Sequence, residues 1–218
     1  MPQIVIDPRS RGNGPFGTTV PELDKRTRKY GYVPDLRRCQ AGDLILSYSC
    51  RLGFIETQIV RTQSERFDAA DSQWTHAAVF LYQDYIVEAV PFKGVITRSL
   101  YEDIPDSVLR IRRKPNLTAE QGYQIALCAQ RMLGSRYSHL RVLRMGVRGI
   151  ASLLNPTWYP EFNPTVICSR IFYDAVVAII RTSLNGCPAV GAVLPAHLSA
   201  TTDLVDINAP WLELTRGG

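Results

Sequence analysis

Short apolar runs, divided by turn residues, fill the first half of the chain and predict strands. One run, residues 44–48, follows the turn pair Gly42-Asp43 and is mostly apolar. Further strands are predicted at 76–82, 85–90, 94–98 and 108–112. The connections are as short as the pair Gln83-Asp84, and links of this length join antiparallel neighbours. The first half therefore predicts an antiparallel meander.

The second half of the chain carries apolar residues at helical spacing. A first helix is predicted after Thr118, which forms a capping-box pattern with Gln121, and Gly134 ends this helix. A second helix is predicted from Cys168 to about Arg181, with an apolar face wide enough for deep burial. The predicted fold class is therefore α+β, with an antiparallel meander or small barrel packed against helices.

Residues 1–40 differ from the rest of the chain in composition. They contain five prolines and the basic run 25–29, with little apolar periodicity. We predict a basic extended N-terminal arm over 1–40 and one domain over 41–218, a length that suits a single buried core. The longest uncharged apolar run, 175–180, is far shorter than the roughly 18 residues that a membrane-spanning helix needs.

The chain contains five cysteines, an odd number, and no C-x-x-C pair. We therefore expect neither a disulfide framework nor a zinc knuckle. His139 and His197 have no carboxylates or thiols at ligand spacing, and no glycine-rich phosphate loop is present, so no metal and no nucleotide cofactor are expected. The net charge of +5 favours anionic partners.

Cys168 is the best candidate for a nucleophile. Unpaired backbone N–H groups and the helix dipole at a helix N-terminus stabilise a thiolate, which is the reactive form of cysteine. His76 opens a predicted strand, and from the end of a sheet an imidazole can reach a helix terminus and serve as the base. Taken alone, each residue is more often structural, since cysteine is among the most buried residue types, and that alternative stays open at this point.

Several short motifs, in a particular order along the chain, support a catalytic role for Cys168 and His76. Residues 41–46 read AGDLIL, 75–81 read THAAVFL and 85–89 read YIVEA, and the segment VICS at 166–169 follows them rather than preceding them. Residues 133–137 read LGSRY and 194–198 read LPAHL. This set resembles the NlpC-type papain-like cysteine hydrolases, in the circularly permuted branch that includes YiiX-like proteins and the lecithin retinol acyltransferase group. Leu194 stands where that branch usually has threonine.

The resemblance implies a permuted papain-like fold over 41–218, with inserts near 50–74 and 138–163. It also implies a catalytic set in which Cys168 attacks an acyl carbonyl, His76 relays the proton and Glu88, twelve residues after His76, orients the imidazole. Backbone N–H groups of Cys168 and Ser169 would form the oxyanion hole. The insert at 50–74 is predicted to form a loop or a short helix over the cleft.

The position of Glu88 allows an internal test of this set. If Gln83-Asp84 were a regular two-residue turn, Glu88 would oppose Val79 and face away from His76. The hypothesis therefore predicts an odd-length loop or a bulge in this hairpin. With Glu88 facing away, Gln58, Tyr48 or a backbone carbonyl would have to orient the imidazole.

The segment 121–160 contains no acidic residue and is rich in arginine. If 139–151 is helical, its apolar side chains share one face and its arginines the other. This is typical of a solvated basic face, and it also suits peripheral membrane contact or an anionic substrate. The arginines of that face are Arg141, Arg144 and Arg148, and the predicted substrate contacts are Tyr48, Trp74, Tyr137, Trp158 and Tyr159.

The resemblance implies a peptidoglycan peptide or an anionic lipid as substrate, and no nucleic acid. We favour a peptidoglycan stem-peptide amidase or endopeptidase acting as an antibacterial effector, with an immunity or delivery protein as a further partner. A lipid-directed acyl hydrolase or acyltransferase is the first alternative function. An inactive binding module of the same fold is the second alternative. The N-terminus lacks a signal-peptide pattern, so a cytoplasmic location and export by a signal-independent system both stay open.

Overall fold

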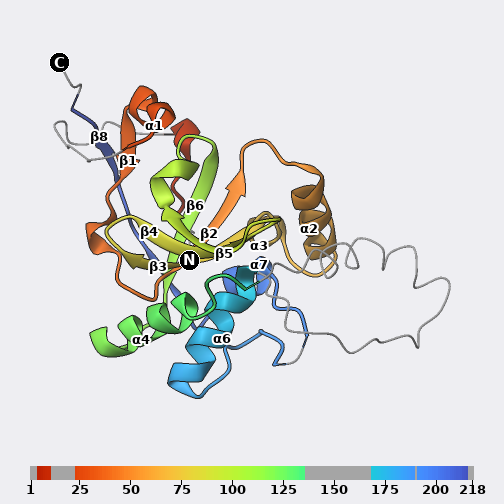
Figure 1. Ribbon diagram of the computed structural model, residues 1–218. Coiled ribbons are helices and arrows are strands. Elements are labelled where there is room, and N and C mark those ends of the chain that lie inside the picture. Colours follow the sequence, from red (N-terminus) through yellow and green to blue (C-terminus); the bar gives the residue numbers. More distant parts are fainter. Residues whose placement is uncertain (1–3, 11–22, 136–167, 190, 216–218) are drawn as a thin grey trace.

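The computed structural model describes residues 4–10, 23–135, 168–189 and 191–215. A six-stranded antiparallel sheet forms its centre, in the order β5-β4-β3-β2-β6-β7 (Figure 1). All five predicted strands are confirmed at nearly the predicted bounds. The strands of this sheet are β2 (Leu44–Ser49), β3 (His76–Tyr82), β4 (Tyr85–Val90), β5 (Gly94–Ser99), β6 (Ser107–Arg113) and β7 (Val205–Ile207).

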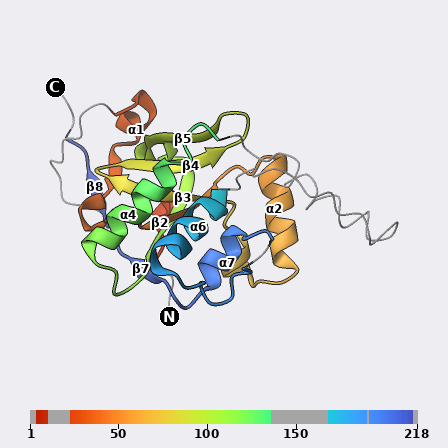
Figure 2. The ribbon, with the colours of Figure 1, turned by 60° about the horizontal axis from the view of Figure 1, so that its bottom comes forward.

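Three helices cover one face of the sheet: α4 (Ala119–Gln130), α6 (Cys168–Ile180) and α7 (Pro195–Ala200) (Figure 2). Alternate strand residues point toward them because successive side chains of a strand face opposite ways. This alternation builds a hydrophobic cluster that includes Leu44, Leu46, Val79, Val87, Ile125 and Phe172. Within the described segments, no helix is long and apolar enough to cross a membrane.

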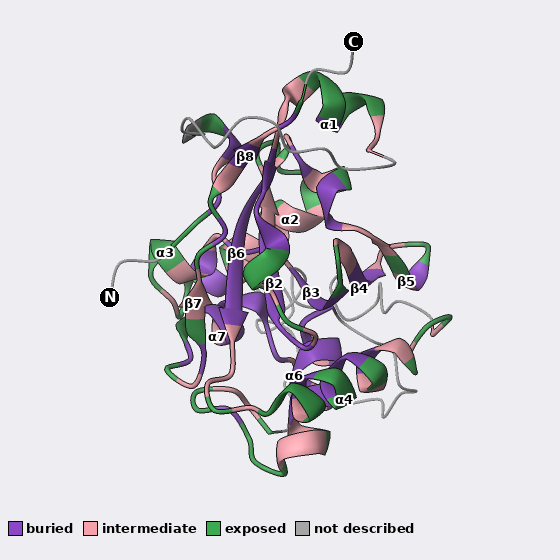
Figure 3. Cartoon of the chain, turned by 90° about the vertical axis from the view of Figure 1, so that its left-hand side faces the viewer, coloured by how far each residue is buried: buried purple, intermediate pink, exposed green. Residues whose placement is uncertain are grey.

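Segments near both ends of the chain cover the opposite face. Strand β1 (Tyr32–Pro34) pairs with β8 (Trp211–Glu213), and α1 (Lys25–Tyr30) begins after Asp24, whose carboxylate caps it. Figure 3 shows the central strands buried, whereas α1 is largely exposed. The second cluster on this face includes Ile6, Val33, Leu36, Ile45, Phe80 and Leu212. The boundary at residue 40 stays a prediction, although residues 25–30 of the predicted arm form a helix.

Helix α4 begins as its sequence predicts. The Thr118 hydroxyl accepts a hydrogen bond from the Gln121 N–H (3.1 Å), and the Gln121 side chain accepts one from the Thr118 N–H (3.0 Å). The helix packs backbone to backbone on the turn before β2, where Gly42 has φ +85° and an added Cβ would come within 2.6 Å of the Gly122 carbonyl oxygen. Glycine at position 42 is therefore required both by conformation and by space.

The insert at 50–74 forms two helices, α2 (Phe54–Ser64) and α3 (Ala69–Ser72). The fully buried amide of Gln63 joins α2 to the segment before β3, because it donates to the carbonyls of Ser72 and Trp74 at 2.8 Å each. Its oxygen accepts from the Ala196 N–H of α7 at 2.9 Å. The insert is thus anchored to the start of the strand that carries His76.

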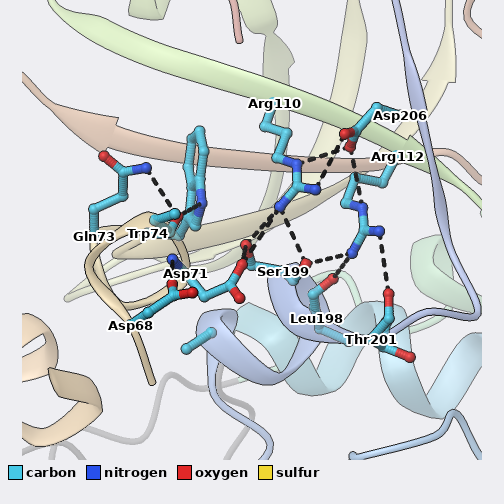
Figure 4. Close-up of polar contacts among 12 residues, drawn as sticks. Asp68, Asp71, Gln73, Trp74, Arg110, Arg112, Leu198, Ser199, Thr201 and Asp206 are labelled. Carbon is cyan, nitrogen blue, oxygen red and sulfur yellow. Dashed lines mark hydrogen bonds and ion pairs between the residues drawn. The ribbon is translucent and has the colours of Figure 1, made fainter. Parts of the chain in front are cut away.

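Two buried arginines of β6 contact β7, α7 and, through Asp71, α3 (Figure 4). Arg110 makes a two-pronged contact with Asp206 of β7 (2.7 and 3.1 Å) and donates to Ser199 of α7 (2.7 Å). Arg112 donates to main-chain carbonyls at and after the end of α7, including those of Leu198 and Thr201. Three short 3-10 helices complete the described fold: η1 (Pro8–Ser10), η2 (Leu36–Arg38) and η3 (Leu100–Asp103).

Candidate active site

A β-bulge in the β3–β4 hairpin places Glu88 on the same face as His76. Tyr82 lies opposite Tyr85 across the two-residue turn, but the register shifts between Phe80 and Tyr82, so that Ala78 lies opposite Glu88. Ala78 and His76 are two residues apart and share a face of β3. The predicted bulge is confirmed, and without it the glutamate would point to the other side of the sheet.

The imidazole of His76 is hydrogen-bonded to Glu88. The distance from Nε2 of His76 to Oε2 of Glu88 is 2.7 Å. The Glu88 side chain is only 1% exposed, whereas that of His76 is 24% exposed and borders the cleft described below. The contact leaves Nδ1 as the second ring nitrogen, available for another partner.

That other partner is Cys168, the first residue of α6. Its side chain is 2% exposed and shares a hydrogen bond with His76, and backbone N–H groups of Ala77 and Ser169 also donate to it. The imidazole therefore lies between a thiol and a carboxylate. The Ser169 hydroxyl turns away from this point and donates to the Val193 carbonyl, so only the main chain of Ser169 faces the sulfur.

The three groups shift one another's pKa values. Burial alone opposes charge on Cys168 and on His76, but the attraction between them and their hydrogen bond outweigh it, so the pKa of Cys168 falls and that of His76 rises well above its ordinary value. Burial likewise opposes charge on Glu88, yet His76 and Arg98 lower the pKa of Glu88 to about 2. All three shifts favour the charged form of the group: the thiolate, the imidazolium and the carboxylate.

Arg98 of β5 is a member of this constellation that the sequence analysis missed. Its Nη2 lies 3.0 Å from Oε2 of Glu88, and its Nε contacts the other carboxylate oxygen. A lone arginine near the end of a strand is usually a solvated charge, so only the pairing of β4 with β5 reveals its position. The residue has no motif of its own that could have indicated it.

A cleft of about 380 Å³ opens beside His76 and Glu88. Its lining combines apolar side chains with charged ones and includes the insert helix α2. The lining residues include Ile55, Glu56, Ile59, Lys93, Ile96 and Glu102. A larger cavity of about 1410 Å³, around Tyr82 and Asp84 at the far end of β3, is not lined by His76. Buried Cys168 lines neither of the two.

Two of the aromatic residues predicted to contact substrate, Trp74 and Tyr48, do not line the cleft. Trp74 is 0% exposed, packs edge-on against Tyr48 with ring centroids 5.6 Å apart, and donates its indole N–H to Ala70, so it belongs to the core. Tyr48 is partly exposed but does not line the cleft, because it points to the opposite side of β2 from Ser47 and Ser49, which do. The remaining predictions, Tyr137, Trp158, Tyr159, Arg141, Arg144 and Arg148, lie outside the described residues.

The other cysteines have no comparable environment. All five are free thiols. Burial raises the pKa of Cys39 to about 12 and that of Cys187 to about 11, which makes both unreactive at neutral pH. His197 accepts a hydrogen bond from the Leu194 N–H at 3.0 Å, so its role is to cap α7.

The fold that these elements define is a circularly permuted NlpC/P60-type papain-like fold, with the cysteine helix after the histidine strand. The solved structure of YiiX from Escherichia coli O157:H7 is similar, with a TM-score of 0.54 and 16% identity over 80% of this chain and 99% of that one. No known protein-family profile and no curated protein sequence matches the chain.

YiiX is described as a metalloprotein. In the part of this chain that the structure describes, no group of three or more His, Cys, Asp or Glu side chains could hold a metal ion. The described residues therefore do not fit a metal centre.

Proposed function

We propose that this protein is a cysteine hydrolase that works through a thioacyl-enzyme. The observation that carries the proposal is the position of His76, hydrogen-bonded to Cys168 on one side and to buried Glu88 on the other. Nucleophile, base and orienting group in this order form the arrangement that activates a thiol on many unrelated folds.

In the first half of the reaction, the Cys168 thiolate attacks the acyl carbonyl carbon and a C–S bond forms. The carbonyl oxygen becomes an oxyanion, stabilised by main-chain N–H groups at the start of α6. The His76 imidazolium then gives its proton to the leaving nitrogen or oxygen, whose bond to the acyl carbon breaks. In the second half, neutral His76 takes a proton from water, the hydroxide attacks the thioester, and the acid leaves as the thiolate returns.

For the substrate, we propose an amide bond in a peptidoglycan stem peptide. Two features support it: the cleft combines apolar Ile55 and Ile59 with charged Glu56 and Lys93, which suits a peptide of mixed character, and the net charge of +5 suits an anionic cell envelope. An enzyme with this substrate would serve as an antibacterial effector.

Acyl lipid is the second candidate substrate. Leu52 and Phe54, at the start of α2, are 48% and 76% exposed and precede Ile55 of the cleft lining. Exposed apolar side chains beside a cleft are typical of proteins that meet a lipid surface.

The substrate test uses purified protein, incubated separately with purified peptidoglycan and with phospholipid vesicles, and mass spectrometry of the products. We expect new muropeptide ends from the wild type and from Cys50→Ala, which removes an exposed thiol, and none from Cys168→Ala. Fatty acid or lysolipid released only when Cys168 is present would favour the second substrate. Equal products from the wild type and Cys168→Ala would refute the hydrolase proposal.

A further inference from the structure

Arg98 holds the carboxylate of Glu88 on the side away from His76. Its Nη2 lies 3.0 Å from Oε2, the oxygen that also bonds His76, and its Nε contacts Oε1. Both oxygens of the buried carboxylate therefore have a partner. A two-pronged contact of this kind fixes the plane of a carboxylate as well as its position.

The register of the sheet brings these two residues together. Glu88 lies opposite Ile96, and Arg98 lies opposite Ile86, so Arg98 is the diagonal neighbour of Glu88 on the same face. Diagonal neighbours are within reach of long side chains. The arginine approaches from β5 while the histidine approaches from β3, and the glutamate stands on the strand between them.

A second carboxylate holds Arg98 in turn. Nη2 of Arg98 lies 2.9 and 3.0 Å from the two oxygens of Asp103 in η3, and its Nη1 donates to the Ser99 carbonyl at 3.2 Å. The side chains of Arg98 and Asp103 are 19% and 20% exposed. The guanidinium is thus clamped between two acids at the edge of the cleft, which Arg98 and Asp103 also line.

We propose that Arg98, clamped by Asp103, is a positioning residue that fixes Glu88 against His76 and keeps the thiolate–imidazolium pair formed. The inference rests on the proposed function, because it assigns a role within that same site. Charges alternate along the line from Cys168 through His76, Glu88 and Arg98 to Asp103. Each inner member is stabilised by opposite charge on both sides, which offsets the cost of burying it.

Other charged groups face this line from neighbouring elements. Glu56 of α2, Lys93 of the β4–β5 turn and Glu102 of η3 line the same cleft. Neither a hydrogen bond nor an ion pair joins any of these three residues to Glu88, whereas Arg98 contacts both of its oxygens. Removing Arg98 therefore removes the permanent cation that contacts the glutamate, and the loss of a nearby positive charge raises the pKa of every acidic group around it.

The test compares Arg98→Met with the wild type in kcat, KM and the pH dependence of kcat/KM. We expect kcat to fall by roughly ten- to a hundredfold, with KM little changed. This is the range found when residues that orient the ligands of metal sites are replaced. The acid limb of the profile should move to higher pH, because the thiolate then forms less readily. Arg98→Lys keeps the positive charge but cannot make the two-pronged contact of the guanidinium. Its kcat should therefore lie between those of Arg98→Met and the wild type.

Arg113→Met is the matched control. Arg113 of β6 makes the same two-pronged contact with a buried carboxylate, Asp43, at 2.7 and 2.8 Å, and its side chain is 21% exposed. Its loss should lower the melting temperature as much as the loss of Arg98 but leave the pH profile in place. Identical profiles for the two methionine variants would overturn the role of Arg98.

A second readout separates this inference from the hydrolase proposal. The ultraviolet absorbance of the Cys168 thiolate, taken as the difference from Cys168→Ala in each background, reports the ion pair without any substrate. Its titration midpoint should rise in Arg98→Met and stay in place in Arg113→Met. An unmoved midpoint in Arg98→Met overturns the inference whatever the activity, whereas wild-type inactivity on every substrate with a shifted midpoint counts against the proposed function alone.

Discussion

Replacing His76 by alanine is expected to lower kcat/KM by roughly a thousandfold or more. The imidazole is hydrogen-bonded to both the Cys168 thiol and the Glu88 carboxylate. Without it, burial raises the pKa of the thiol, so the thiolate is lost at neutral pH. The leaving group also loses its proton donor. Steady-state kinetics on the substrate identified by product analysis measure the effect.

His197→Ala is the control for the loss of an imidazole. His197 caps α7 and contacts the Phe67 ring at 5.0 Å between centroids. This variant should lose some stability but keep a kcat/KM close to that of the wild type. If His76→Ala were folded and retained activity close to that of His197→Ala, His76 would have no role in proton transfer.

Asp206→Asn is expected to destabilise the fold by about 3–5 kcal/mol, the cost of leaving a buried charge unpaired. Asp206 is the carboxylate that faces both arginines of β6, with contacts of 2.7 Å to Arg110 and 3.2 Å to Arg112. Burial, followed by the charge of Arg110, lowers the pKa of Arg112 to about 10, so this cation is already poorly compensated. For a chain of this size the melting temperature should fall by roughly 6–20 °C.

Asp174→Asn is the matched control for this prediction. Asp174 also pairs with an arginine, Arg170, but one helical turn away on α6 and with 39% of its side chain exposed. Such pairs contribute less than about 1 kcal/mol. Thermal unfolding of the two variants should differ clearly, and equal melting temperatures would show that the arginine cluster does not hold α7 and β7 to the sheet.

The elements that carry the site were predictable because their signals are local. Apolar runs bounded by Gly42-Asp43 and by Gln83-Asp84 mark strands, and the Thr118–Gln121 pair marks the start of a helix. The bulge was predictable for a different reason: a regular turn puts Glu88 and His76 on opposite faces, so any contact between them requires an irregular hairpin.

The rest depends on pairing between segments distant in sequence. Arg98 reaches Glu88 only through the register of β4 with β5. Arg110 and Arg112 are buried because β7 pairs with β6 and α7 accepts their hydrogen bonds. Trp74 was wrongly predicted to contact substrate, because the sequence does not show that other segments bury it. An aromatic residue two positions before His76 suggested a substrate contact, but the insert helix α2 and Tyr48 enclose it.

The pH titration of the Cys168 thiolate tests the proposed site most directly. It is the difference in ultraviolet absorbance between the wild type and Cys168→Ala, so the other thiols and the tyrosines cancel. Because the pKa of Cys168 is lowered and that of His76 raised, the thiolate should already be present well below about pH 8 and should persist as the pH rises. In His76→Ala the same signal should appear only at higher pH. A wild-type signal that appears only above about pH 9, unchanged by the loss of His76, would contradict the assignment of Cys168 as the nucleophile.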